Sequence, residues 1–323
     1  MNNWLNYLEF ASVEFTIEAV TPLLLPVYKG STFRGAFGNQ FKEIVCINRK
    51  RDCEKCILSD NCPYYRIFET PNTLDLDWFS SPKLPRPFVL EPPLTSKENF
   101  ETGEKLKFRI VLIGSAVDYL SYFIFVFDKI GSYTGFGKDR RQGNGRFKIC
   151  EVRDNFAHNR IIYNGINKKL SHNIKIKTGE ELINESDNRK KTAVLTFITP
   201  TRIKHNKEYV FFKGNNGFSP DVLINTIYRR LFLLCAGHCK NDILIGTVPD
   251  LSKIKLDKVD LSWYDWKRYS SRQDKKQPFG GFVGQVVLKN LSDDFMRVLR
   301  IGEITHIGSG TVFGLGKYVI TDF

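Results

Sequence analysis

Histidine is scarce in this sequence, with five among 323 residues and none before His158. A long apolar run is also absent, because the most apolar stretch, residues 110–127, is interrupted by glycine, serine and aspartate. The first residues lack the basic start and apolar segment of a signal peptide. These absences predict a cytoplasmic protein and exclude a membrane as its partner.

Acidic residues are fewer than basic ones, 35 against 48, which gives a net charge of +13 and a pI of about 9.3. A positive field of this size favours polyanions. With the membrane excluded, nucleic acid is the better partner. The length is enough for two domains of ordinary size, each with its own core.

Seven cysteines in a cytoplasmic chain argue against a disulfide framework. Four of them cluster with the spacing C-x6-C-x2-C-x5-C, at Cys46, Cys53, Cys56 and Cys62. Four nearby thiolates complete a tetrahedral site, so we expect structural Zn²⁺. An iron–sulfur cluster uses the same four-thiolate set and is the alternative. Neither leaves an open position, so we expect no catalysis at this site and no cofactor for catalysis.

One short phrase occurs twice. Residues 143–149 and 314–320 both read Gly-x-Gly, a cation, an aromatic residue, any residue and Ile, and further glycines precede each copy. The openings of the two halves also match, with Thr-Pro at residues 21–22 and again at residues 199–200. This repetition indicates a tandem duplication of one small fold. Each copy carries a glycine-rich loop, and such loops can expose backbone N–H groups to anions.

Both halves read as β-α-β-β-α-β. Alternating apolar residues predict the strands, and 3.6-residue periodicity predicts the helices. We therefore predict an α+β fold of tandem ferredoxin-like (RRM-like) domains with glycine-rich loops and a small four-cysteine insertion. The predicted parts are an N-terminal domain at 1–153 with its insertion at about 46–69, a connector at 154–191, and a C-terminal domain at 192–323.

Residues 263–273 interleave rings with cations, as platforms for single-stranded RNA do. The alternative is that the tryptophans belong to a core and the cations to a solvated edge. Further cations lie inside the first glycine loop, and backbone donors are expected in the second. The RNA-binding candidates are Arg140, Arg141, Arg268, Tyr269, Arg272, Gly308, Gly310, Gly314, Gly316 and Lys317.

His306 differs from the other histidines, because it stands two residues before Gly308 at the mouth of the second glycine loop. A histidine beside a phosphate cradle is a candidate acid or base, although a lone loop histidine is more often structural. Lys29 and Arg34, just before and within the first predicted helix, are surface charges by default.

Several stretches carry a resemblance to a known family: residues 90–93, 268–273, 280–284 and, most specifically, 306–316. At these motifs the chain resembles the CRISPR-associated endoribonucleases of the RAMP superfamily that process precursor CRISPR RNA. The cysteine insertion looks like that of one branch of this family. The resemblance covers nearly the full length. It implies two ferredoxin-like domains and, as partners, CRISPR repeat RNA or crRNA and other CRISPR effector-complex proteins.

The chemistry implied by the resemblance is metal-independent. The ribose 2′-OH attacks the adjacent phosphorus and leaves a 2′,3′-cyclic phosphate and a 5′-OH. Many members place a catalytic histidine near the first helix, where this sequence has none. The expected catalytic residues are therefore His306, another distant histidine, or a set such as Tyr28, Lys29 and Arg34. A non-catalytic RNA-binding subunit of a CRISPR effector complex is the alternative function, and an iron–sulfur redox protein is a third.

Overall fold

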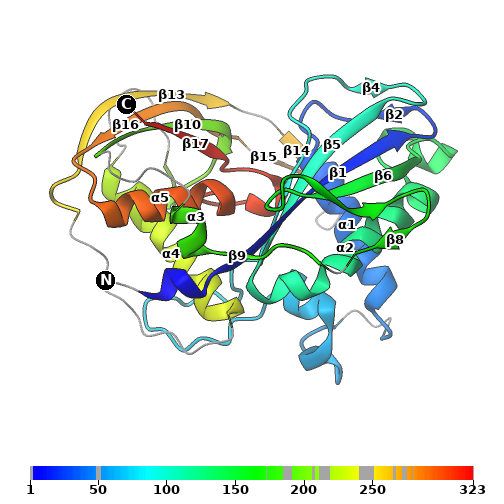
Figure 1. Cartoon of the computed structure of the whole chain (residues 1–323), viewed down its shortest axis with the longest axis horizontal. Helices are drawn as coiled ribbons and strands as arrows, with labels where there is room; N and C mark the ends of the chain where they lie inside the picture. Colours follow the sequence, from blue (N-terminus) through cyan, green and yellow to red (C-terminus); the bar gives the residue numbers. More distant parts are fainter. Residues whose placement is uncertain are drawn as a thin grey trace. The chain divides into compact units, whose positions relative to one another are not determined.

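The computed structural model describes ten stretches of the chain, which divide into two units (Figure 1). The N-terminal unit comprises Leu8–Lys177 and Ala236–Asn241, and the C-terminal unit comprises Met1–Tyr7, Thr178–Cys235 and Asp242–Phe323. The described stretches are residues 3–48, 52–171, 173–184, 191–205, 208–210, 219–239, 251–264, 267–270, 275–278 and 280–322.

The N-terminal unit contains an antiparallel sheet with the strand order β3-β5-β1-β6, extended by β7 and β8 at one edge. Helices α1 and α2 both cover one face of this sheet (Figure 1). The order 2-3-1-4 of the first four strands is that of a ferredoxin-like fold, as predicted. The bounds are β1 (Glu9–Ala19), α1 (Gly30–Val45), β3 (Phe88–Glu91), β5 (Lys105–Ile113), α2 (Leu120–Lys129), β6 (Phe147–Asp154), β7 (Arg160–Asn164) and β8 (Lys169–Leu170).

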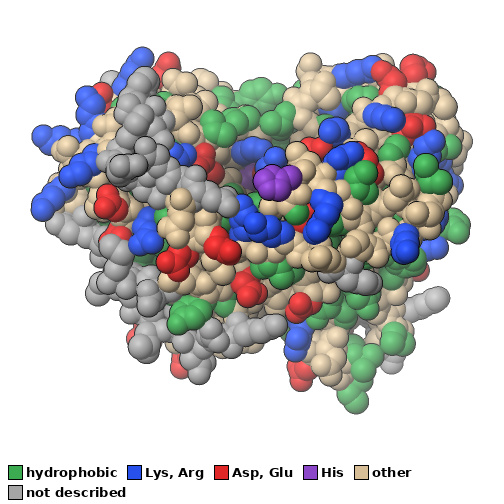
Figure 2. Space-filling view, in the orientation of Figure 1, with side chains coloured by type: hydrophobic (Ala, Val, Ile, Leu, Met, Phe, Trp, Pro, Cys, Tyr) green, Lys and Arg blue, Asp and Glu red, His purple; other side chains and the backbone are tan. Residues whose placement is uncertain are grey.

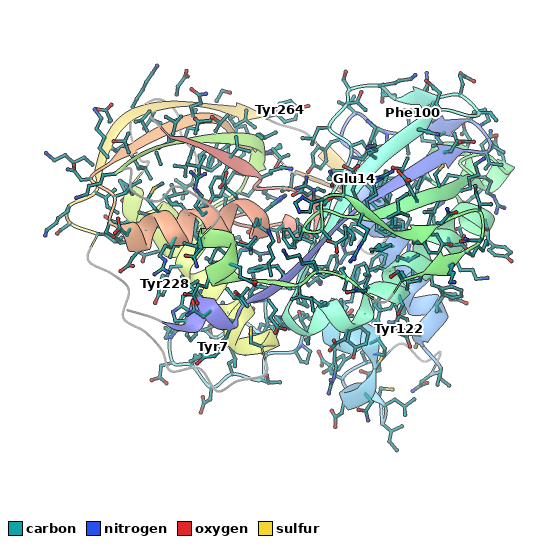
Figure 3. All side chains as sticks on the ribbon, in the orientation of Figure 1. Tyr7, Glu14, Phe100, Tyr122, Tyr228 and Tyr264 are labelled. Carbon is teal, nitrogen blue, oxygen red and sulfur yellow. The ribbon has the colours of Figure 1, made fainter. Side chains whose placement is uncertain are left out.

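Phenylalanine fills the space between sheet and helices in this unit. The Phe15 ring on β1 stacks on Phe108 of β5 with centroids 4.7 Å apart, and Phe37 of α1 stacks on Phe123 of α2 at 4.6 Å. Because strand side chains alternate between faces, Glu14 points to the other side of β1, where it pairs with Lys107 at 2.8 Å (Figure 3). The alternating residues in the sequence thus correspond to a sheet with one apolar face, which the helices cover, and one polar face.

The C-terminal unit repeats the arrangement with the strand order β13-β16-β10-β17, covered on one face by α4 and α5 (Figure 1). The N-terminal 3-10 turn (Asn3–Tyr7) belongs to this unit, because Trp4 packs edge-on against Tyr228 of α4 with centroids 5.4 Å apart. The bounds are α3 (Gly179–Asn184), β10 (Thr192–Thr201), α4 (Pro220–His238), β13 (Lys255–Tyr264), β16 (Gly281–Lys289), α5 (Asp293–Thr305) and β17 (Tyr318–Asp322).

Several short strands pair outside the two main sheets or at their edges. β2 pairs with β4, β11 with β12, and β14 with β15, while β9 pairs with β1. None of the helices in the described stretches is long and apolar enough to cross a membrane. The bounds are β2 (Leu23–Leu24), β4 (Asn99–Phe100), β9 (Lys177–Thr178), β11 (Lys204–His205), β12 (Glu208–Tyr209), β14 (Lys267–Ser270) and β15 (Lys275–Pro278).

Candidate functional site

The second glycine loop connects α5 to β17, and its glycines adopt left-handed backbone conformations. Gly308, Gly310, Gly314 and Gly316 have φ between +76° and +86°. A Cβ atom at Gly316 would lie 1.9 Å from the carbonyl oxygen of Ile307, so two backbone segments approach there too closely for any side chain. Glycine is required here by the path of the chain.

Two of these glycines use their amides within the protein. The N–H of Gly316 donates to Pro200 O at 3.1 Å, and the N–H of Gly314 donates to Thr311 O at 2.9 Å. Both residues are buried, while Gly308 and Gly310 are half-exposed. The predicted phosphate cradle therefore does not extend to Gly314 and Gly316 in this conformation, because their N–H groups already have partners.

The first glycine loop closes in the same way. The N–H of Gly145 donates to Pro22 O at 2.9 Å, as that of Gly316 does to Pro200 O. The next residue, Arg146, donates its N–H to Thr21 Oγ1 at 2.9 Å. Its counterpart Lys317 donates to Thr199 Oγ1 at 2.8 Å. The matching hydrogen bonds confirm the internal repeat and explain the repeated phrase as a structural closure of each unit.

His306 is fully buried, with none of its surface exposed. It ends α5 with φ +59°, and its Nδ1 lies 3.1 Å from Leu315 O inside the loop. Arg230 of α4 donates from Nε to Thr305 O at 3.1 Å and to His306 O at 3.2 Å. Burial lowers the pKa of Arg230 to about 10, so it stays protonated at neutral pH. The sequence analysis expected His306 at the mouth of the loop. In the structure its ring is buried and contacts the backbone of the loop at Leu315.

A hairpin that the sequence analysis did not single out adjoins this loop. Ser309 N–H donates to Arg202 O at 2.8 Å, and Arg202 leads directly into the β11–β12 hairpin. There the Arg202 guanidinium lies 4.2 Å from the ring centroid of Tyr209, and Lys204 Nζ lies 4.9 Å from the same centroid. Lys204 and His205 are exposed. The run Arg-Ile-Lys-His, one residue after the second Thr-Pro pair, is the sequence signal that could have identified it.

In the N-terminal unit, Lys29 is buried and does not face solvent. Its ammonium donates to Thr95 O at 2.7 Å, Val27 O at 3.1 Å and Pro26 O at 3.3 Å. Burial lowers the pKa of Lys29, while Glu98 acts in the opposite direction. These bonds fix the chain before α1, so the default interpretation of Lys29 as a surface charge is wrong. The same burial leaves it poorly placed to contact a phosphate.

Tyr28 and Arg34 have different surroundings. Burial and the negative charge of Glu91 both raise the pKa of Tyr28 above its ordinary value, so its phenol remains protonated and suits a proton donor better than a base. Arg34 lies on α1 with its guanidinium 4.3 Å from the ring centroid of Phe68, and Arg86 lies 5.5 Å from the same centroid. A cation–ring–cation group therefore forms on the N-terminal unit.

The remaining RNA-binding candidates fall into three groups. Arg140 and Arg141 are exposed in a 3-10 turn (Lys138–Gln142), and Lys317, directly before β17, is half-exposed. On the face drawn in Figure 2, Lys and Arg side chains are spread over both units. Arg268 and Tyr269 lie in β14, opposite Gln277 and Lys276 of β15. Arg272 lies outside the described residues.

The four clustered cysteines line one pocket, and none of them forms a disulfide. Four sulfur donors around one pocket fit a thiophilic ion such as Zn²⁺. These cysteines lie in the segment between α1 and the π-helical turn η3 (Tyr65–Glu69).

Known protein families match parts of both units. A family model for an N-terminal domain, AF_1859_N, matches residues 8–175, and the model for CRISPR-associated endoribonuclease Cas6 matches residues 195–318. The second match contains the hairpin and the second glycine loop. An uncharacterised protein of Archaeoglobus fulgidus is 24% identical over 299 residues, which cover 92% of each chain.

Solved structures show the same fold over the whole chain. A Cas6 product complex is similar with a TM-score of 0.56 and 13% identity, covering 97% of this chain and 100% of that one. Thermus thermophilus Cas6 has a TM-score of 0.51 and 12% identity, covering 97% and 99%. A partial Cas6-RT-Cas1–Cas2 complex has a TM-score of 0.56 and 10% identity, covering 98% of this chain and 46% of that chain.

The first family model spans more than half of the sequence, and the fold likeness extends over both ferredoxin-like units. The chain therefore belongs to the family defined by this N-terminal domain, and its residues 195–318 match the model of the CRISPR-associated endoribonuclease Cas6.

Proposed function

We propose that this protein cleaves precursor CRISPR RNA within its repeats, by attack of a ribose 2′-OH on the adjacent phosphorus, and needs no metal ion for the reaction. The products are a 2′,3′-cyclic phosphate and a 5′-OH. The observation that carries the proposal is the Cas6 endoribonuclease match over residues 195–318. The net charge of +13 supports an RNA partner.

The reaction requires a base for the 2′-OH, an acid for the leaving oxygen, and cations for the phosphorane. Among the described histidines, His238 and His306 are buried, whereas His158 and His205 are exposed. We place proton transfer at His205, because it is the exposed histidine of the β11–β12 pair, and this pair follows Arg202, whose carbonyl accepts the N–H of Ser309 in the glycine loop. An exposed imidazole can accept the proton of the 2′-OH or donate one to the leaving oxygen.

The phosphate path over the C-terminal unit then runs along the β11–β12 hairpin. Tyr209 offers a ring on which a base can stack, and the two cations beside it can neutralise phosphates. In the N-terminal unit, exposed Arg140 and Arg141 supply further phosphate contacts. Other subunits of a CRISPR effector complex are proposed partners; among similar structures, one is a Cas6-RT-Cas1–Cas2 complex.

A non-catalytic RNA-binding subunit is the second candidate. The burial of His306 and Lys29 favours it, because two residues expected to act on the phosphate face the protein interior. The two functions differ in one respect that can be measured directly: only an enzyme cuts the repeat at a single site.

The test is incubation of the protein with end-labelled repeat RNA from the host's own CRISPR array in excess EDTA. We expect one cut, which a 2′-deoxy substitution at the cut site abolishes because the nucleophile is gone. His205→Ala should slow single-turnover cleavage about 10²–10⁴-fold and leave the RNA dissociation constant nearly unchanged. His158→Ala is the matched control, an exposed histidine of the other unit.

Binding without any cut would establish the non-catalytic subunit. A wild-type cleavage rate in His205→Ala would remove this histidine from the mechanism and leave the endoribonuclease assignment intact. His306→Ala, by contrast, should lower stability, RNA binding and cleavage together, since its ring holds Leu315 inside the loop.

A further inference from the structure

We call residues 46–62 the cysteine lobe; this segment connects the end of α1 to η3. Cys46 follows the last residue of α1, Cys53 and Cys56 flank one tight turn, and Cys62 follows a short 3-10 helix (Ser59–Asn61). All four side chains line the same pocket and all are free thiols. The four cysteine residues thus border the same pocket.

The lobe has no apolar core in its described residues. None of these residues is buried, and Ile57 is 96% exposed while Ile47 is 83% exposed. Its backbone hydrogen bonds are local, such as Ser59 N–H to Cys56 O at 2.9 Å. Without buried apolar surface, hydrophobic burial cannot hold such a segment in one conformation. A crosslink between the cysteines around the shared pocket would hold the lobe in one conformation.

We propose that Cys46, Cys53, Cys56 and Cys62 bind one Zn²⁺ ion in tetrahedral coordination. Thiolate sulfur is the ligand type that zinc prefers in closed structural sites. In this conformation, no three His, Cys, Asp or Glu side chains of the described residues are arranged closely enough to hold a metal ion. Binding therefore draws the sulfur atoms together, and the folding of the lobe depends on the ion.

The zinc ion also restrains the segment that comes directly after the lobe. Beyond Cys62 the chain forms η3, whose Phe68 packs so closely on α1 that a Cβ atom at Gly38 would lie 2.3 Å from its ring. The same ring carries Arg34 and Arg86. Clamping the lobe to the end of α1 restrains the position of this cation–ring–cation group. The zinc is structural in this role and takes no part in RNA cleavage.

The test is metal analysis of the full-length protein, purified without added metal under anaerobic conditions. We expect about one zinc per chain, retained in Cys150→Ser and Cys239→Ser and lost in Cys56→Ser and Cys62→Ser. Cobalt substitution should give the visible absorption of a tetrahedral four-sulfur site. Chelation should expose the lobe to trypsin, for example at Lys55, while both ferredoxin-like units stay protected.

Three outcomes would overturn the proposal. Four free thiols with no bound metal would show that the lobe folds without an ion. Iron together with acid-labile sulfide would replace zinc by an iron–sulfur cluster. Retention of zinc in both lobe variants would place the ion elsewhere. None of these results depends on whether the protein cleaves RNA, so the proposed function stands or falls separately.

Discussion

A histidine beside a glycine-rich loop is a natural candidate for proton transfer, yet the ring of His306 lies inside its loop. The sequence shows its distance from Gly308 along the chain but not the direction of its side chain, which depends on the left-handed backbone at the end of α5. Lys29 is similar, because its ammonium turns inward to three carbonyl groups. At the scale of single residues, burial shows that these two side chains support the fold and do not face a substrate.

Tyr318 makes burial measurable through pH. Its hydroxyl donates to Leu299 O at 2.6 Å, and burial raises its pKa well above the ordinary value of about 10. Above pH 10 the unfolded chain loses this proton while the folded chain keeps it, so the free energy of unfolding falls as pH rises. Tyr318→Phe should cost about 1 kcal/mol at pH 8 and show a shallower decline above pH 10 in urea unfolding.

Tyr264→Phe is the control for this prediction, because Tyr264 lies in the same unit and is 45% exposed (Figure 3). Its replacement should leave both the stability at pH 8 and the alkaline decline close to those of the wild type. Identical alkaline slopes in Tyr318→Phe and wild type would contradict the role assigned to burial.

At the scale of elements, the β11–β12 hairpin contains a candidate surface that neither of its strands provides alone. Each strand has only two residues, and antiparallel pairing sets Lys204 opposite Tyr209. Arg202 meets the same ring from just before the hairpin. The glycine loop then attaches to the hairpin through Ser309. A short element thus acquires its position from a loop about a hundred residues later in the sequence.

The double variant Arg202→Ala/Lys204→Ala tests this element. If each cation contacts one phosphate of single-stranded RNA, the slope of log K against log salt concentration should flatten by about 0.7 per contact, or about 1.4 in total. The control Lys253→Ala/Lys258→Ala removes two exposed charges from the same unit. Fluorescence anisotropy over a range of salt concentrations gives both slopes. Equal flattening in the two variants would mean that only net charge matters.

At the scale of the whole molecule, the duplication is visible in hydrogen bonds as well as in sequence. Both units use a threonine hydroxyl to accept the N–H of the cation after the glycines. Both use a proline carbonyl to accept the N–H of the second glycine. The two ferredoxin-like cores are therefore closed by the same device, whatever functions their surfaces acquired.

Thr21→Val and Thr199→Val remove this device from one unit each. Thr21 is half-buried, so its loss should cost about 0.5–1 kcal/mol. Thr199 is buried and also donates to Gly314 O at 2.8 Å, so its loss should cost about 1–3 kcal/mol. The costs should add in the double variant, because the sites share no partner. Native-state hydrogen exchange resolves the two units, and a non-additive result would contradict independent closure.

The order of elements, the internal repeat and the ferredoxin-like fold class are all readable from the amino-acid sequence alone. Hydrophobic periodicity is local, so the β-α-β-β-α-β order of both units could be predicted. The repeated glycines were also readable, because tight turns with positive φ require glycine wherever they occur. The spacing of the four cysteines predicted a zinc site, which stays a prediction, and the four residues line one pocket.

The roles of the loop residues, by contrast, depend on contacts that form only in the folded chain. Thr199 and Gly314 are 115 positions apart, and their contact cannot be read from local pattern. Such long-range contacts occupy the amides of the second glycine loop, bury His306 and bring Arg202 beside Ser309. Hydrogen bonds and burial are set by neighbours in space. The candidate site therefore moved from the histidine that precedes the glycines to the hairpin bonded to their loop.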